Sequence, residues 1–128
     1  MLTSYFSKTK SFNTKLKSNI VSIARITPKG FTGRGYLDLA PPSDLVKAFK
    51  DLKIDKDEFI INYNELVLDK LSVHQVYQDL GENAILCCYG KSDSFCHRIL
   101  VRDWFNSNGY HVEEYKDPKK SLNINEYI

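Results

Sequence analysis

The sequence predicts a single α/β domain in which a small, mostly parallel sheet is flanked by helices. Two short apolar runs, at residues 19–26 and 84–89, are too brief for helices and are typical of strands buried on both faces. Near the C-terminus a strand, a helix and a strand follow one another over about 30 residues, which predicts a βαβ unit with parallel strands. The 128 residues, 42% of them apolar, suit one domain. We expect residues 1–115 to form it and residues 116–128 to be a surface extension.

The first part of the chain predicts two strands and a basic loop. Residues 2–6 favour an edge strand, because Tyr and Thr suit a pleated surface. The strand at residues 19–26 ends before the breaker Thr27-Pro28. The loop that follows, TPKGFTGRGY, has three glycines among its cations and is the most basic loop of the chain.

Capping patterns predict the helices in the middle of the chain. Ser43 follows two prolines and is a good N-cap for a helix over residues 43–51. Asp55 with Glu58, and Ser72 with Gln75, resemble capping boxes, and an apolar stripe follows each of them. A glycine at position 81 then stops the second of these two helices.

The last part of the chain predicts a central strand, a helix and a final strand. Residues 84–89 form the strand, and the polar loop GKSDS leads to a helix that opens with Cys96-His97-Arg98 and ends before Gly109. Residues 110–115 predict the strand that completes the βαβ unit.

Composition limits the classes of function. A net charge of +2 is too mild to predict nucleic-acid binding from bulk charge, so any preference for anions must be local. No apolar run approaches the roughly 20 residues that span a bilayer, and the N-terminus lacks the apolar core of a signal peptide. We therefore expect a cytoplasmic protein with no membrane partner. The odd count of three cysteines, Cys87, Cys88 and Cys96, indicates reduced thiols.

The candidate site lies where two loops leave the sheet. In open parallel sheets, ligands bind beyond the carboxyl ends of the strands. If the strands at residues 19–26 and 84–89 are neighbours, their loops converge on one basic mouth that suits an anionic ligand. The candidate ligand-binding residues are Tyr5, Arg25, Lys29, Arg34, Cys88, Lys91 and Arg98.

The start of the last helix carries the candidate chemistry. A helix N-terminus attracts anions, and a planar guanidinium such as that of Arg98 suits phosphate or carboxylate. Cys96, beside His97 and Arg98, is in a setting that lowers the pKa of a thiol, so Cys96 and His97 are candidates for nucleophile and proton carrier. Two alternatives stay open. Cys96 and His97 pack without a chemical role, or the Gly-Arg-Gly loop is only a solvated turn.

Two sharper motifs do not fit. Cys96 and Arg102 have the spacing of phosphocysteine phosphatases, but the residues between them lack the glycines that wrap a phosphate. Cys87 and Cys88 are adjacent in a strand and point to opposite faces, so both cannot join Cys96 and His97 around one structural zinc ion. We predict neither a metal site nor a cofactor.

The run ILCCYGKSDSFCHRILVRDWF resembles the signature of the domain of unknown function family four-eighty-eight, in which Leu-Cys-x-Glu precedes Cys-His-Arg and a helix with a tryptophan. TSYF, VSIARITPKGFTG and LAPP resemble other blocks of this family, so the likeness covers most of residues 2–115. It implies a Rossmann-like domain and an enzyme of unassigned activity, found in bacteria and their phages. Gly90 stands where the family has its acidic residue, so this chain either binds without turnover or uses Asp93 instead.

Three hypotheses of function follow. The first is an enzyme directed at a nucleotide or nucleic acid, which binds an anionic group at the helix N-terminus. The second is a non-catalytic module that binds a ligand or inhibits a partner through the same pocket. In the third, the Cys-His-Arg signature only supports the fold.

Overall fold

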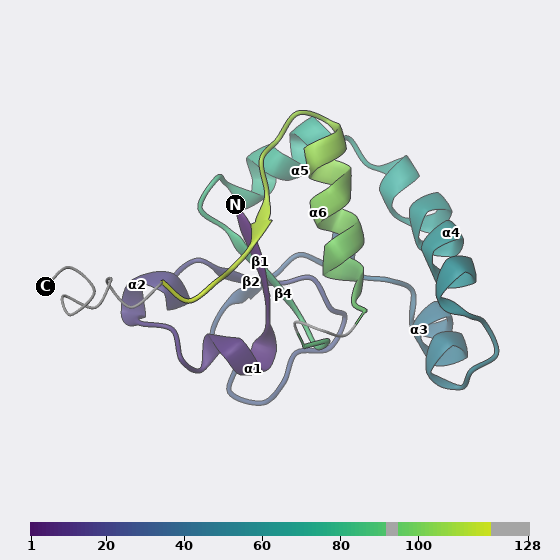
Figure 1. Cartoon of the computed structure of the whole chain (residues 1–128), viewed down its shortest axis with the longest axis horizontal. Coiled ribbons are helices and arrows are strands. Elements are labelled where there is room, and N and C mark those ends of the chain that lie inside the picture. The colour runs from purple at the N-terminus through teal and green to yellow at the C-terminus, as the bar shows by residue number, and fades with distance from the viewer. Residues whose placement is uncertain (92–94, 119–128) are drawn as a thin grey trace, which may run out of the picture.

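The computed structural model describes residues 1–91 and 95–118 (Figure 1). In this part of the chain a parallel sheet has the strand order β3-β2-β4-β1-β5. The strands are β1 (Leu2–Tyr5), β2 (Ile20–Ser22), β3 (Arg34–Gly35), β4 (Ile85–Cys88) and β5 (Glu113–Glu114). The expected α/β class is confirmed, and the strands that precede the two candidate loops, β2 and β4, are neighbours as the site hypothesis requires.

Helices cover both faces of the sheet (Figure 1). The core on one face of the sheet includes residues of the four longer helices, and the core on the other face includes residues of two short helices near the N-terminus. The longer helices are α3 (Ser43–Lys50), α4 (Lys56–Leu66), α5 (Val73–Leu80) and α6 (His97–Ser107). The short ones are α1 (Phe6–Thr9) and α2 (Thr14–Lys17), and two 3₁₀ turns lie at Leu37–Leu39 and Leu68–Lys70.

Two of the three predicted N-caps, Asp55 and Ser72, are confirmed. The Asp55 side chain accepts a hydrogen bond from the backbone N–H of Glu58 at 2.8 Å, and Ser72 Oγ accepts one from Gln75 at 3.3 Å. Gly81 follows α5 with φ of 87°, a conformation that costs glycine little. Helix α3 begins at Ser43 rather than one residue later, so Pro42 and not Ser43 is its N-cap.

The predicted edge strand at residues 2–6 is wrong in its position. Strand β1 lies inside the sheet, between β4 and β5. Its buried residues Thr3 and Ser4 are small and polar. The sequence therefore shows no apolar run at β1 that would predict a strand buried on both faces. The neighbour on its outer side, β5, is only two residues long, which is shorter than the strand predicted at residues 110–115.

The apolar run at residues 19–26 is only partly a strand. β2 ends at Ser22, whose Oγ accepts a hydrogen bond from the backbone N–H of Ala24 at 3.2 Å and turns the chain. This turn brings Arg25 to the carboxyl end of the sheet. Asp117, in the segment expected to be a surface extension, pairs with Lys8 at 2.5 Å. Among the described residues, no helix has both the length and the apolar character to cross a membrane.

Candidate functional site

A pocket of about 580 Å³ opens where β2 and β4 end and α6 begins, and we call it the β2–β4 pocket. Its floor carries Cys88, Cys96 and His97, and aromatic side chains of α3, α4 and the loop before α6 form an apolar wall. The cations of its lining are Arg25, Lys47 and Lys50, all exposed. The residues that line it are Ala24, Arg25, Ile26, Pro41, Ser43, Val46, Lys47, Phe49, Lys50, Asp51, Phe59, Cys88, Tyr89, Gly90, Phe95, Cys96 and His97.

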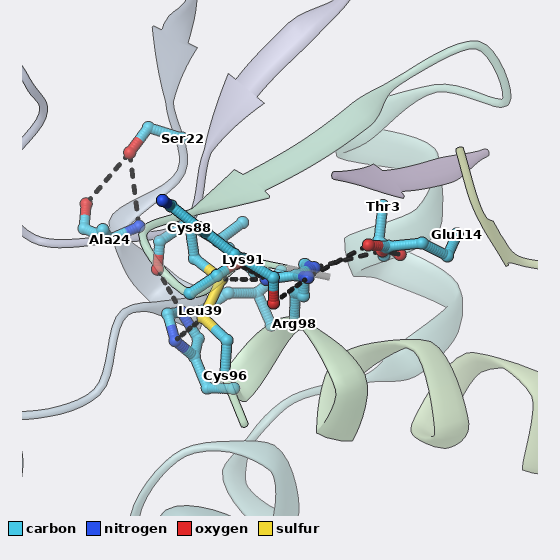
Figure 2. Close-up of a disulfide and its surroundings, with 12 residues drawn as sticks. Thr3, Ser22, Ala24, Leu39, Cys88, Lys91, Cys96, Arg98 and Glu114 are labelled. Atoms are coloured by element: carbon cyan, nitrogen blue, oxygen red, sulfur yellow. Dashed lines mark hydrogen bonds and ion pairs between the residues drawn. A yellow bond between two sulfur atoms is a disulfide. The ribbon is translucent and has the colours of Figure 1, made fainter. Parts of the chain in front are cut away.

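The expectation that all three cysteines are reduced is wrong for two of them in this structure. Cys88, the last residue of β4, and Cys96, the N-cap of α6, are joined in a disulfide (Figure 2). The end of β4 and the start of α6 therefore lie against each other, a contact that spacing alone did not reveal. Cys87 is free and buried on the opposite face of the sheet, and burial raises the pKa of its thiol to about 12.

Gly90 makes the contact between strand and helix possible. A Cβ atom at this position would lie 2.8 Å from the Cβ of Cys96 and 3.1 Å from the carbonyl oxygen of Phe95. Real carbon atoms do not pack this closely, so any larger residue must displace Cys96. The departure from the family's acidic residue therefore has a steric consequence as well as a chemical one.

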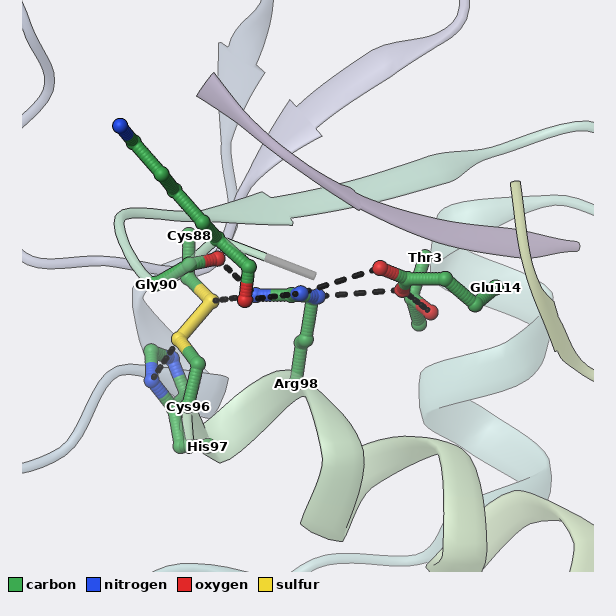
Figure 3. Close-up of polar contacts among 8 residues, drawn as sticks. Thr3, Cys88, Gly90, Cys96, His97, Arg98 and Glu114 are labelled. Carbon is green, nitrogen blue, oxygen red and sulfur yellow. Dashed lines mark hydrogen bonds and ion pairs between the residues drawn. A yellow bond between two sulfur atoms is a disulfide. The ribbon is translucent and has the colours of Figure 1, made fainter. Parts of the chain in front are cut away.

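His97 is held in one orientation at the pocket floor. Its Nε2 donates a hydrogen bond to the carbonyl oxygen of Ile23 at 2.7 Å, so the lone pair of the neutral ring is on Nδ1. Nδ1 lies 3.7 Å from Cys96 Sγ (Figure 3). Burial lowers the pKa of His97 to about 4, although the bond to Ile23 opposes this shift.

Arg98 is 1% exposed and does not line the pocket; its guanidinium lies between Cys88 and Glu114 (Figure 3). Its Nε and Nη2 bind the two carboxylate oxygens of Glu114, each at 3.0 Å. Nη1 donates to Cys88 Sγ at 3.3 Å and to the carbonyl oxygen of Gly90, and Nη2 also donates to that of Lys91 at 3.3 Å. These bonds use all five N–H groups of the guanidinium, so none is left for an anionic ligand.

The structure brings only part of the predicted site together. Arg25, Cys88, Cys96 and His97 line the β2–β4 pocket, whereas the described lining does not include Tyr5, Lys29, Arg34 or Lys91. Tyr5 instead stacks its ring 5.6 Å from the guanidinium carbon of Arg98, and Lys91 offers Arg98 its carbonyl group.

Arg34 lies on β3 at the edge of the sheet. There it donates to the carbonyl oxygens of Asp79 and Leu80, at 3.2 and 2.5 Å. The proposed substitute carboxylate, Asp93, lies outside the described residues.

Sequence reasoning missed three residues of the site. Lys47 and Lys50 are three residues apart on α3, so they lie on one side of the helix. No sequence pattern predicts that this side of α3 faces the pocket. The sequence predicts only a strand at Glu114, because its pairing with Arg98 is a contact between separate parts of the chain.

Comparison with known proteins supports the family resemblance. A family model described as the active DUF488-N3 subclade matches residues 5–109, which is most of the chain. Neither the curated proteins nor the solved structures contained a match. On the strength of the family model and the Cys-His-Arg helix start, the chain belongs to the DUF488 family of domains of unknown function.

Proposed function

We propose that this chain is an enzyme that acts on a nucleotide, either free or as a unit of a nucleic acid, in the β2–β4 pocket. The observation that carries the proposal is the 3.7 Å approach of Cys96 Sγ to Nδ1 of His97 at the floor of that pocket. In the reduced protein, the low pKa of His97 keeps its ring neutral, so Nδ1 is placed to accept the thiol proton as the sulfur attacks the substrate. The Ile23 carbonyl fixes the ring so that this nitrogen, and not Nε2, points at the sulfur.

The lining supports a nucleotide as the substrate. Phe95 packs edge to face against Phe49 and Phe59, which are tilted to each other, and the three rings give the pocket an apolar wall that suits a base. Arg25, Lys47 and Lys50 place positive charge around the same opening, which suits a phosphate. Lys47 pairs with Asp51 at 3.0 Å, but an ion pair this exposed is worth little and does not prevent phosphate binding.

The family description also supports an enzyme, because it calls the matching subclade active. Those words state neither the reaction nor the substrate of that subclade. The substrate class proposed for this chain depends on the composition of the pocket.

The direct test is a thermal-shift screen of the reduced protein with nucleoside monophosphates, nucleosides and inorganic phosphate. A ligand that binds only the folded state at 100 times its Kd stabilises it by about 2.7 kcal/mol. We expect nucleoside monophosphates to raise the melting temperature more than nucleosides or phosphate do. The double variant Lys47→Ala/Lys50→Ala should lose most of this rise, while Lys15→Ala/Lys17→Ala, on α2 at the other face, should keep it.

The chemistry is then tested with Cys96→Ser and a nucleotide that the screen identifies. Loss of turnover with retained binding supports the proposal. If inorganic phosphate stabilises the protein as much as any nucleotide does, or if Cys96→Ser turns over normally, the proposal is wrong.

The second candidate is a binding module that uses the same pocket without chemistry. Two observations favour it: Gly90 supplies no carboxylate, and the disulfide occupies the Cys96 sulfur. The two candidates differ in the reactivity of the reduced protein. A catalytic thiol with a base beside it should react with iodoacetamide at neutral pH faster than an unfolded control of the same chain does, and a packing thiol should react more slowly.

A further inference from the structure

We propose that, in the reduced protein, Cys88, Cys96 and His97 bind one zinc ion and leave a fourth coordination position open to the β2–β4 pocket. The ligand atoms of these three residues lie within 4.8 Å of one another. They come from the end of β4 and the first turn of α6, two elements that the packing of α6 on the sheet holds together. Two cysteines and a histidine form one of the ligand sets that zinc uses in catalytic sites.

The distances suit a tetrahedral ion. Zn–S and Zn–N bonds of about 2.3 and 2.0 Å place a sulfur and a nitrogen ligand about 3.5 Å apart. Cys96 Sγ and His97 Nδ1 are 3.7 Å apart. The Cα atoms of Cys88 and Cys96 are 6.9 Å apart, beyond the usual range for a disulfide, so the backbone leaves room for an ion between two separated sulfurs.

The groups around the three donors are those that a metal site needs. Metal-bound histidines usually donate their second N–H to a carbonyl or carboxylate, and His97 donates Nε2–H to the Ile23 carbonyl at 2.7 Å. Cys88 Sγ accepts an N–H from Arg98 at 3.3 Å, a bond that stabilises a thiolate. The charge of Arg98 is matched by Glu114, so two thiolates remain to balance the charge of Zn²⁺.

The positions of Cys87 and of the pocket limit the protein ligands of the ion to three. Cys87 lies in the core on the other face of the sheet, so it cannot reach the site, as its position next to Cys88 in the strand predicted. Beside the three donors lies the pocket of about 580 Å³, which holds ample space for a water molecule or a substrate atom. A three-ligand ion with an open position is the arrangement of catalytic rather than structural zinc.

The disulfide must be reduced before the ion binds. A dithiol transfers two electrons and two protons to the Cys88–Cys96 bond, which gives two thiols and the cyclic disulfide of the reductant. Each thiol then loses its proton when the sulfur binds the metal, so uptake of one Zn²⁺ releases two protons from the cysteines. Oxidised protein should therefore bind no zinc at this site.

This proposal uses the same site as the proposed function, but it does not require a reaction. In the metal-bound protein, Cys96 is a ligand, and a water molecule on the ion takes the place of the thiolate as the nucleophile. Metal binding and nucleotide binding have separate readouts. Zinc uptake without nucleotide stabilisation would contradict only the proposed function, and the reverse result would contradict only the metal site.

The test is a titration of the reduced, metal-free protein with Co²⁺ and then with Zn²⁺. We expect one equivalent of Co²⁺ to produce a sulfur-to-metal charge-transfer band and the intense visible bands of tetrahedral cobalt, and one equivalent of Zn²⁺ to abolish both. Cys88→Ser, Cys96→Ser and His97→Asn should each weaken binding by at least about 100-fold. The matched control Cys87→Ser should bind one equivalent as the wild type does.

A second measurement does not depend on how the variants fold. One equivalent of Zn²⁺ should protect Cys88 and Cys96 of the wild-type protein from iodoacetamide, as read by peptide mass spectrometry. The proposal is overturned if Co²⁺ gives no charge-transfer band, or if Zn²⁺ leaves the alkylation of these two cysteines unchanged. Retained one-to-one binding in the folded Cys96→Ser variant would overturn it as well.

Discussion

Arg98 and Glu114 form a bidentate ion pair that connects the start of α6 to β5, the strand beside β1. Both bonds measure 3.0 Å, and Thr3 Oγ1 donates to one of the same carboxylate oxygens at 2.5 Å (Figure 2). Because the remaining N–H groups of Arg98 bind Cys88 and two loop carbonyls, one side chain links β5, β4 and the loop before Cys96. Arg98 therefore positions residues that line the pocket, although it does not line the pocket itself.

Removing the carboxylate should be costly. Glu114→Ala leaves a guanidinium that is 1% exposed without its counter-charge, and breaking a buried pair in this way costs about 3–5 kcal/mol. We expect the free energy of unfolding, measured with urea, to fall by about 3 kcal/mol. The control is Glu113→Ala, since its exposed partner His111 makes a surface pair worth less than about 1 kcal/mol.

A small effect of Glu114→Ala, within about 0.5 kcal/mol of the wild type, would contradict this assignment of Arg98. Arg98→Ala is a poor test of ligand binding for the same reason, because loss of the guanidinium would disturb the fold first. The variants Lys47→Ala and Lys50→Ala test anion binding without that ambiguity, since both side chains are exposed.

Arg98 also shows what the sequence could and could not predict. The helix start at Cys96-His97-Arg98 was predicted because apolar periodicity and capping are local signals. The partner of Arg98 lies 16 residues further on, and the sequence pattern contains no information on which charges meet. The sequence therefore predicts a ligand for Arg98 from its residue type and its place at a helix start, and both are compatible with a partner inside the protein.

The order of the strands limited the rest of the site prediction. The site hypothesis requires that β2 and β4 be adjacent strands. They are adjacent, so Arg25 lines the same pocket as Cys96 and His97. Arg34 does not reach it, because its segment forms the edge strand β3 instead of a loop over the mouth. Strand order depends on packing between distant segments, so a pattern that is local in sequence could not exclude this outcome.

Gly90 provides the next prediction. Gly90→Ala should destabilise the protein by about 1–3 kcal/mol, because the new Cβ would lie 2.8 Å from the Cβ of Cys96 and must displace it. The matched control is Gly35→Ala, where an added Cβ meets no atom within 4 Å. Urea unfolding of the two variants measures the difference.

The same contact bears on the carboxylate that the family signature carries at this position. Gly90→Glu should move Cys96 away from Cys88, so slower formation of the Cys88–Cys96 disulfide under mild oxidant is the expected result. Disulfide formation at the wild-type rate in Gly90→Glu would show that the loop accommodates a side chain here.

The three cysteines should differ in reactivity. In the reduced, metal-free protein, Cys96 and Cys88 line the pocket, whereas Cys87 is fully buried on the other face. We expect iodoacetamide at neutral pH to label Cys96 first and to leave Cys87 unlabelled until the protein unfolds. Peptide mass spectrometry over time measures the order, and early labelling of Cys87 would contradict the burial that the structure shows.

Leu52 offers a test that is independent of the site. It follows α3 with φ of 59° and is 89% exposed, so a branched side chain adopts the left-handed conformation with little packing in return. This conformation costs a residue with a Cβ roughly 1–2 kcal/mol more than it costs glycine. Leu52→Gly should therefore raise the free energy of unfolding by about 1 kcal/mol, while Leu52→Ala, which loses the same exposed side chain but keeps the Cβ, should not. Equal stability of the two variants would mean that residue 52 does not hold a left-handed conformation in solution.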